Sequence, residues 1–169
     1  MHLLIWDYIT ATFLLEKISN KTHIINDPFA VRNIPEKLFS LNLLKFMPPT
    51  MFTQDVKEII KFKNKYKKIV IKPTHGFGGK NIFFVNKKTN KNKILIYLKK
   101  QHHVMVQKFL PGIKNGDKRI FIINGIVMGV IRRIPKKGSI VSNLGQGGKA
   151  VKTELTQKEL NVAKQIATL

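Results

Sequence analysis

The sequence contains no cysteine in its 169 residues, which excludes both a disulfide framework and a thiol nucleophile. Carboxylates are also scarce, because there are only nine Asp and Glu residues and none of them lies between Ile59 and Gly116. Hard cations such as Mg²⁺ bind carboxylate oxygens. We therefore assign no metal ligand in this chain.

A long uninterrupted hydrophobic run is missing as well. The most apolar stretch, Leu3–Leu15, is interrupted by Asp7 and Thr10. It has neither the basic start and small-residue cleavage site of a signal peptide nor the length of a membrane span. The sequence predicts a soluble, cytoplasmic protein with no membrane partner.

Positive charge is abundant: the formal net charge is +22, and 27 of the 31 basic residues are lysines. Such an excess can bind nucleic acid, an anionic membrane or small anionic substrates. Lysine, isoleucine and asparagine are also the residues that an AT-rich genome favours, and the sequence shows no pattern of exposed aromatic residues on a strand that would read RNA. We expect no nucleic-acid partner, and a basic nucleic-acid-binding module is kept as the alternative function.

A glycine-rich loop with a lysine at each end, Lys72–Lys80, lies between two β-type runs at 69–71 and 82–85. Glycines allow backbone N–H groups to approach an anion, and the lysines neutralise its charge. Asn81 stands where a P-loop needs Ser or Thr and where the dinucleotide fingerprint needs its third glycine. The remaining interpretations are a glycine flap that covers phosphates from above and an ordinary hairpin turn.

The periodicity predicts a mixed α and β chain in which antiparallel hairpins dominate. Helices are expected at 3–18, from Pro35, at 53–66 and after the capping box of Thr156 and Glu159. Strands are expected at 24–25, 50–52, 69–71, 82–85, 104–108, 120–123 and 126–131. Residues 93–100 fit a helix or a strand. Residues 136–149 contain four glycines and are expected to form a long mobile loop.

Seven short segments in a fixed order resemble one known family. They are Tyr8-Ile9-Thr10-Ala11-Thr12, Glu36-Lys37-Leu38-Phe39, Ile71-Lys72-Pro73 with the flap, Gln107-Lys108-Phe109-Leu110-Pro111, Gly116-Asp117-Lys118-Arg119, Arg133-Ile134-Pro135, and Asn143-Leu144 with Gly147-Gly148. Together they are similar to the prokaryotic glutathione synthetases, which are ATP-grasp ligases.

The resemblance implies an α+β ATP-grasp fold of largely antiparallel sheets with flanking helices, incomplete in this chain. Residues 1–34 would end an amino-terminal domain, 35–110 would form the ATP-grasp lid domain, and 111–169 would begin the carboxy-terminal ATP-grasp domain. The implied reaction joins γ-glutamylcysteine to glycine with ATP through an acyl phosphate. The family uses Mg²⁺ or Mn²⁺, and we expect a homo-oligomer when the fold is complete.

The resemblance also implies roles for individual residues. Lys37 and Lys72 would hold the ATP phosphates, and Arg119 and Arg133 would steady the acyl phosphate and its tetrahedral intermediate. Asp117 would lie near the nucleotide. The other implied site residues are Gly76, Gly78 and Gly79 in the flap, Gln107, Lys108, Phe109 and Leu110 in the adenine-binding connector, and Asn143, Gly147 and Gly148 in a substrate loop.

The chain departs from the family pattern at three places. The family carries an arginine shortly before the Asn143-Leu144 element, where this chain has Ile140-Val141-Ser142. The family's metal ligands would lie beyond Leu169, and its Asp-Pro-Pro-Phe-Asp segment is absent before Tyr8. We therefore expect a fragment that ligates little or not at all by itself.

Overall fold

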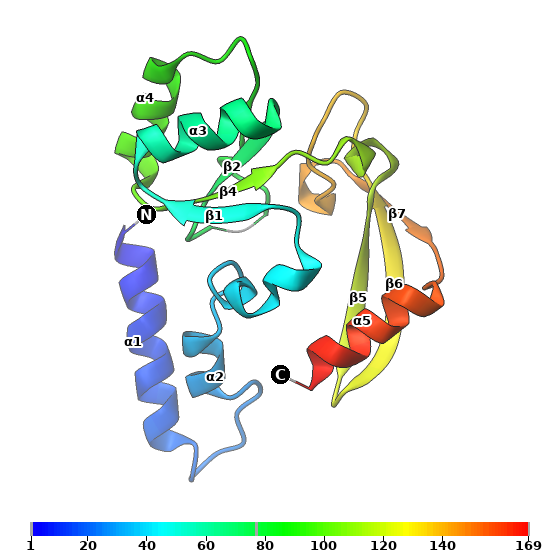
Figure 1. The fold of residues 1–169 in the computed structure, drawn as a ribbon. Coiled ribbons are helices and arrows are strands. Elements are labelled where there is room, and N and C mark those ends of the chain that lie inside the picture. The colour runs from blue at the N-terminus through cyan, green and yellow to red at the C-terminus, as the bar shows by residue number, and fades with distance from the viewer. Residues whose placement is uncertain (1, 77, 169) are drawn as a thin grey trace. The chain divides into compact units, whose positions relative to one another are not determined.

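The computed structural model describes residues 2–76 and 78–168, with side chains from Trp6 onward. The chain divides into two compact units, Met1–Asn42 and Leu43–Leu169. Figure 1 shows the elements of each unit. No helix among the described residues combines the length and the hydropathy that crossing a membrane requires.

The first unit holds two helices, α1 (His2–Ile18) and α2 (Pro28–Asn33). Arg32 of α2 joins them, because its guanidinium lies 3.8 Å from the ring centre of Phe13 and 2.7 Å from the Glu16 carboxylate of α1. Cation–π and ionic contacts thus share one mostly buried arginine. The prediction of a helix at 3–18 is confirmed.

Two predictions in this region are wrong. Residues 24–25 form no strand, and the second helix begins at Pro28 rather than at Pro35. Asp27 caps α2, since its carboxylate accepts the Phe29 N–H at 3.0 Å, and Pro28 occupies the first position, where no donor is needed. After Pro35 the chain makes a turn and then a 3₁₀ helix, η1 (Phe39–Phe46), which runs into the second unit.

The second unit contains a four-stranded antiparallel sheet with the order β1 (Thr50–Thr53), β4 (Val104–Lys108), β2 (Ile69–Pro73) and β3 (Phe83–Val85). Helices α3 (Val56–Tyr66) and α4 (Lys91–Gln101) cover one face of it (Figure 1). Their shared core consists of Ile59, Ile69, Ile71, Val85, Ile94, Leu98, Val104 and Val106. Because strand side chains alternate, Val70, Lys72, Phe84 and Gln107 lie on the opposite face.

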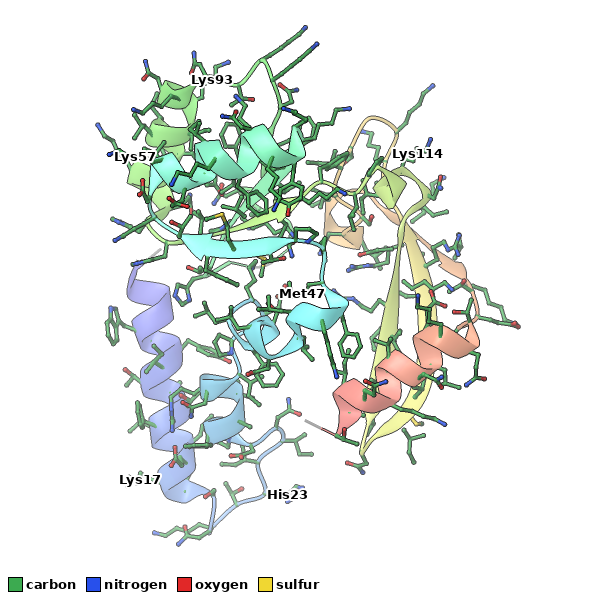
Figure 2. All side chains as sticks on the ribbon, in the orientation of Figure 1. Lys17, His23, Met47, Lys57, Lys93 and Lys114 are labelled. Carbon is green, nitrogen blue, oxygen red and sulfur yellow. The ribbon has the colours of Figure 1, made fainter. Side chains whose placement is uncertain are left out.

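Local capping explains both helices. Asp55 caps α3 by accepting the Lys57 N–H at 2.7 Å, two residues later than the predicted cap at Thr53. Asn90 caps α4 by accepting the Lys93 N–H at 3.0 Å, so the segment 93–100 is helical. The outer surface is rich in lysine, and Figure 2 shows Lys57 on α3 and Lys93 on α4 pointing outward.

A second antiparallel sheet has the order β5 (Asp117–Ile123), β6 (Ile126–Ile134) and β7 (Lys149–Lys152). The short 3₁₀ helix η2 (Pro111–Asn115) leads into β5 from the first sheet. The predicted turn between β5 and β6 is confirmed, since Asn124 and Gly125 have φ of 49° and 77°, as the tight hairpin requires. Helix α5 (Gln157–Ala167) follows, and the capping box of Thr156 and Glu159 is confirmed.

Glu159 also ties α5 to the second sheet and makes that junction sensitive to pH. The Lys118 ammonium donates to its carboxylate at 2.7 Å, and the Thr156 N–H donates at 2.7 Å. Lys118, and then Thr156, hold the pKa of Glu159 at about 2, below its ordinary 4.5. A lowered folded pKa stabilises the protein above the ordinary value and loses that contribution as the pH falls toward 2.

We expect the melting temperature to fall as the pH is lowered from 5 to 2, with a smaller fall in the Glu159→Gln variant because that variant cannot lose the ionised carboxylate. Thermal unfolding at several pH values measures this. Glu154→Gln removes an exposed carboxylate nearby and should keep the wild-type dependence. An identical dependence in Glu159→Gln and the wild type would contradict the assignment.

Candidate functional site

The glycine flap spans the residues between the last β2–β3 pair, Ile71 with Phe83. It is therefore longer than the two to five residues of a tight hairpin turn. Gly78 and Gly79 have φ of 70° and 76°, a conformation that side chains rarely adopt. A Cβ on Gly79 would lie 2.4 Å from Cγ1 of Val141, so the flap touches the loop before β7. The flap interpretation accounts for this length and these glycines better than an ordinary turn does.

Lys72 lies at the start of the flap, on the sheet face opposite α3 and α4. Its Nζ donates to Oε1 of Gln107 at 2.5 Å, and Nε2 of Gln107 donates to Oγ1 of Thr50 at 2.9 Å. Gln107 is only 7% exposed, so its amide has a fixed orientation between the two partners. Three strands thus contribute to the hydrogen-bond chain that holds this ammonium group on the sheet face.

The predicted connector, Gln107 to Leu110, leaves the end of β4. The Lys108 N–H donates to the Pro49 carbonyl at 3.0 Å, and the Phe109 N–H donates to the Lys68 carbonyl at 3.0 Å. The Phe109 ring meets Phe84 edge-on, with ring centres 4.8 Å apart. Phe84 lies on the same face as Lys72, and Leu110 is 52% exposed. The connector therefore offers apolar side chains next to a cationic face.

The second sheet brings together two residues to which the resemblance gave different roles. Asp117 and Arg133 are direct cross-strand partners. Nε of Arg133 donates to Oδ1 of Asp117 at 3.0 Å, and Nη2 donates to Oδ2. This two-point contact fixes the plane of the guanidinium. Arg119, two residues after Asp117 on the same strand, shares that face and is exposed.

This face of the second sheet points away from α5. Lys118 lies between Asp117 and Arg119 and reaches Glu159 at the start of α5. Alternation along β5 therefore places Asp117 and Arg119 on the opposite side of the sheet from Lys118.

The predicted substrate loop is folded on itself. Oδ1 of Asn143 accepts the Gly145 N–H at 2.8 Å and begins a short 3₁₀ turn, η3 (Leu144–Gln146). Gly147 follows with φ of 84°, and a Cβ on Gly148 would lie 2.4 Å from the Ser142 carbonyl oxygen. Asn143, Gly147 and Gly148 thus shape the loop that presents Val141 to the flap.

Lys37 is described within the first unit, in the turn between α2 and η1. Its carbonyl accepts the hydroxyl of Ser40. Sequence reasoning missed Thr50 and Phe84, because only the strand register shows that they share a face with Lys72.

In the part of the chain that the structure describes, no three His, Asp or Glu side chains come together as a set of metal ligands. The Asp117 carboxylate is already bound by Arg133. No catalytic step is therefore assigned to a metal held by these residues.

A family model described as the ATP-grasp domain of prokaryotic glutathione synthetase matches residues 36–169. The chain belongs to this family. A glutathione synthetase of Bradyrhizobium diazoefficiens is 41% identical over 160 residues, which cover 92% of this chain and 50% of that relative. One from Prochlorococcus marinus is 41% identical over 164 residues, covering 95% and 53%. The chain spans about half the length of the curated relatives it matches.

Solved structures show the same fold at low identity. D-cycloserine synthetase DcsG superposes with a TM-score of 0.69 at 16% identity, covering 94% of this chain and 59% of that one. The ATP-grasp ligase PsnB, complexed with its minimal precursor, Mg and ADP, gives a TM-score of 0.62 at 21% identity, covering 89% and 45%. The expectation of an α+β ATP-grasp fold is confirmed.

Proposed function

We propose that this chain binds ATP between the flap and the sheet face that carries Lys72, and serves the ATP-dependent ligation of γ-glutamylcysteine to glycine. One observation carries the proposal: Gln107, which also bonds Thr50, holds the ammonium of Lys72 on the strand that leads into a loop whose glycine backbone can approach an anion. The reaction is the one that the family resemblance implies, and the relatives are named glutathione synthetases.

The chemistry needs positive charge more than a nucleophile from the protein. The γ-glutamylcysteine carboxylate attacks the γ-phosphorus of ATP, and ADP leaves with the electrons of the broken P–O bond. The glycine amine then attacks the acyl phosphate, loses a proton and expels phosphate. Negative charge develops on phosphate and carbonyl oxygens in both steps, so fixed cations lower both barriers.

The proposed roles divide between the two sheets. Lys72 holds the phosphates, the flap glycines cover them, and residues 107–110 bind adenine. Lys37 as a second phosphate-binding lysine stays a prediction of the family resemblance. Arg119 and Arg133 steady the acyl phosphate and the tetrahedral intermediate. Asp117 acts through Arg133, because a carboxylate that is bound at two points orients the guanidinium and would repel a phosphate placed directly on it.

The proposal names γ-glutamylcysteine and glycine as the substrates. It also includes a cytoplasmic location, a complete enzyme that is a homo-oligomer, and no nucleic-acid partner. Asn143, Gly147 and Gly148 shape the loop that shields the intermediate from water.

Titration of the 169-residue chain with a fluorescent ATP analogue tests the proposal. We expect saturable binding that ATP displaces and duplex DNA does not, both with and without added Mg²⁺. Displacement by duplex DNA with a steep salt dependence would favour the basic nucleic-acid-binding module instead. A failure of ATP to displace the analogue would overturn the nucleotide assignment.

A further inference from the structure

Tyr97 of α4 contacts both ends of the flap. Its hydroxyl donates to the carbonyl oxygen of Asn81, where the flap ends, at 2.5 Å. The same oxygen lies 3.5 Å from the carbonyl oxygen of Ile71, just before the flap begins. Its ring stacks on Phe83 with ring centres 5.2 Å apart. One side chain therefore joins the helix layer to the point where the flap returns to the sheet.

The contact with Asn81 acts on an unusual piece of backbone. Asn81 has φ of 57°, so the chain turns sharply there with a residue other than glycine. A hydrogen bond to its carbonyl helps to hold that conformation, because the alternative extended backbone would move the oxygen away from Tyr97. The turn comes two residues after Gly79, and it sets the direction in which the flap enters β3.

The Tyr97 hydroxyl stays protonated under ordinary conditions and can therefore always donate this hydrogen bond. Burial among α4, β2 and β3 raises the pKa of Tyr97 to about 12. The hydroxyl thus keeps its proton at any pH at which the protein would be assayed, and the bond to Asn81 does not depend on pH in that range.

We propose that Tyr97 is a positioning residue for ATP, whose hydroxyl holds the return of the flap so that the backbone of Gly78 and Gly79 stays over the phosphates. The inference rests on the proposed ATP binding. Tyr97 touches no phosphate itself; it acts by reducing the number of flap conformations that the nucleotide must select, which raises affinity without a new contact.

The test compares Tyr97→Phe, which keeps the stacked ring, with Tyr66→Phe as a matched control. Tyr66 ends α3, the other helix on the same face; its ring packs on Phe62 and has Nζ of Lys108 6.0 Å from its centre, and the substitution keeps that ring. We expect Tyr97→Phe to weaken ATP binding about three- to tenfold, the effect of one hydrogen bond, with adenosine affinity unchanged since adenosine has no phosphates. Tyr66→Phe should change neither affinity.

Hydrogen–deuterium exchange of the ligand-free chain gives a readout that does not depend on ATP. Exchange at residues 78–83 should become faster in Tyr97→Phe and stay at the wild-type rate in Tyr66→Phe. Unchanged exchange in that segment, unchanged ATP affinity, or an equal loss of ATP and adenosine affinity would each overturn the role of Tyr97. If the segment loosens but the wild type binds no ATP, both the proposed function and the nucleotide role of Tyr97 fall, while the contact itself is established.

Discussion

Replacing Lys72 with methionine is expected to raise the Kd for ATP on the order of 100-fold, because a hydrogen bond between charged groups contributes about 1.5–3 kcal/mol. Methionine keeps most of the side-chain volume at this half-buried position of an otherwise buried strand. The substitution also leaves Oε1 of the buried Gln107 without its ammonium donor. We therefore expect a loss of stability of about 1–3 kcal/mol in addition to the loss of affinity.

Two further variants separate these effects. Lys68→Met removes the same charge from an exposed position just before β2 and should bind ATP as the wild type does. Isothermal titration well below the unfolding temperature measures affinity, and urea denaturation measures stability. Equal weakening in Lys68→Met and Lys72→Met would show that ATP responds to overall charge rather than to the flap site.

Replacing Gly116 with alanine is expected to lower the free energy of unfolding by about 2–6 kcal/mol. Its φ of 87° alone costs a side chain about 1–3 kcal/mol. The new Cβ would also lie 2.4 Å from the Arg133 carbonyl oxygen and 3.2 Å from Cα of Ile134. These are backbone atoms, so relief requires β5 and β6 to separate where Asp117 pairs with Arg133, at a further cost of about 1–3 kcal/mol.

Two other glycines isolate the two contributions in the same denaturation experiment. Gly125→Ala has a φ of 77° but nothing within 4 Å of the added Cβ, and should lose only about 1–3 kcal/mol. Gly112→Ala has neither feature and should be close to neutral. If Gly116→Ala loses no more stability than Gly125→Ala, the predicted clash with the β6 backbone is contradicted, and the ends of β5 and β6 separate at little cost.

Local signals in the sequence predicted the elements that depend on a few adjacent residues. The hairpin at Asn124-Gly125 and the capping box at Thr156 need only their own neighbours. Residues 93–100 stayed ambiguous for a physical reason: Ile94, Ile96 and Leu98 alternate as in a strand, whereas only Ile94 and Leu98, four residues apart, are buried. The cap at Asn90 and the packing of α4 on the sheet stabilise the helical conformation.

The sequence predicted the individual residues of the candidate site but not the contacts between them. Lys72 and Gln107 were each assigned from a motif, yet their contact requires the antiparallel register of β2 with β4. The same holds for Asp117 and Arg133, which become partners only through the β5–β6 register. Tyr97 belongs to no motif, because its importance comes from its contacts with the two ends of the flap rather than from the residues beside it in sequence.

The contact between Gly79 and Val141 couples two segments that are 62 residues apart in the sequence. Val141 lies against the flap at Gly79, so a movement of the flap there changes its packing against the loop before β7. Under the proposed function, the mobility of that loop as well as the mobility of the flap would then affect how long a nucleotide stays bound.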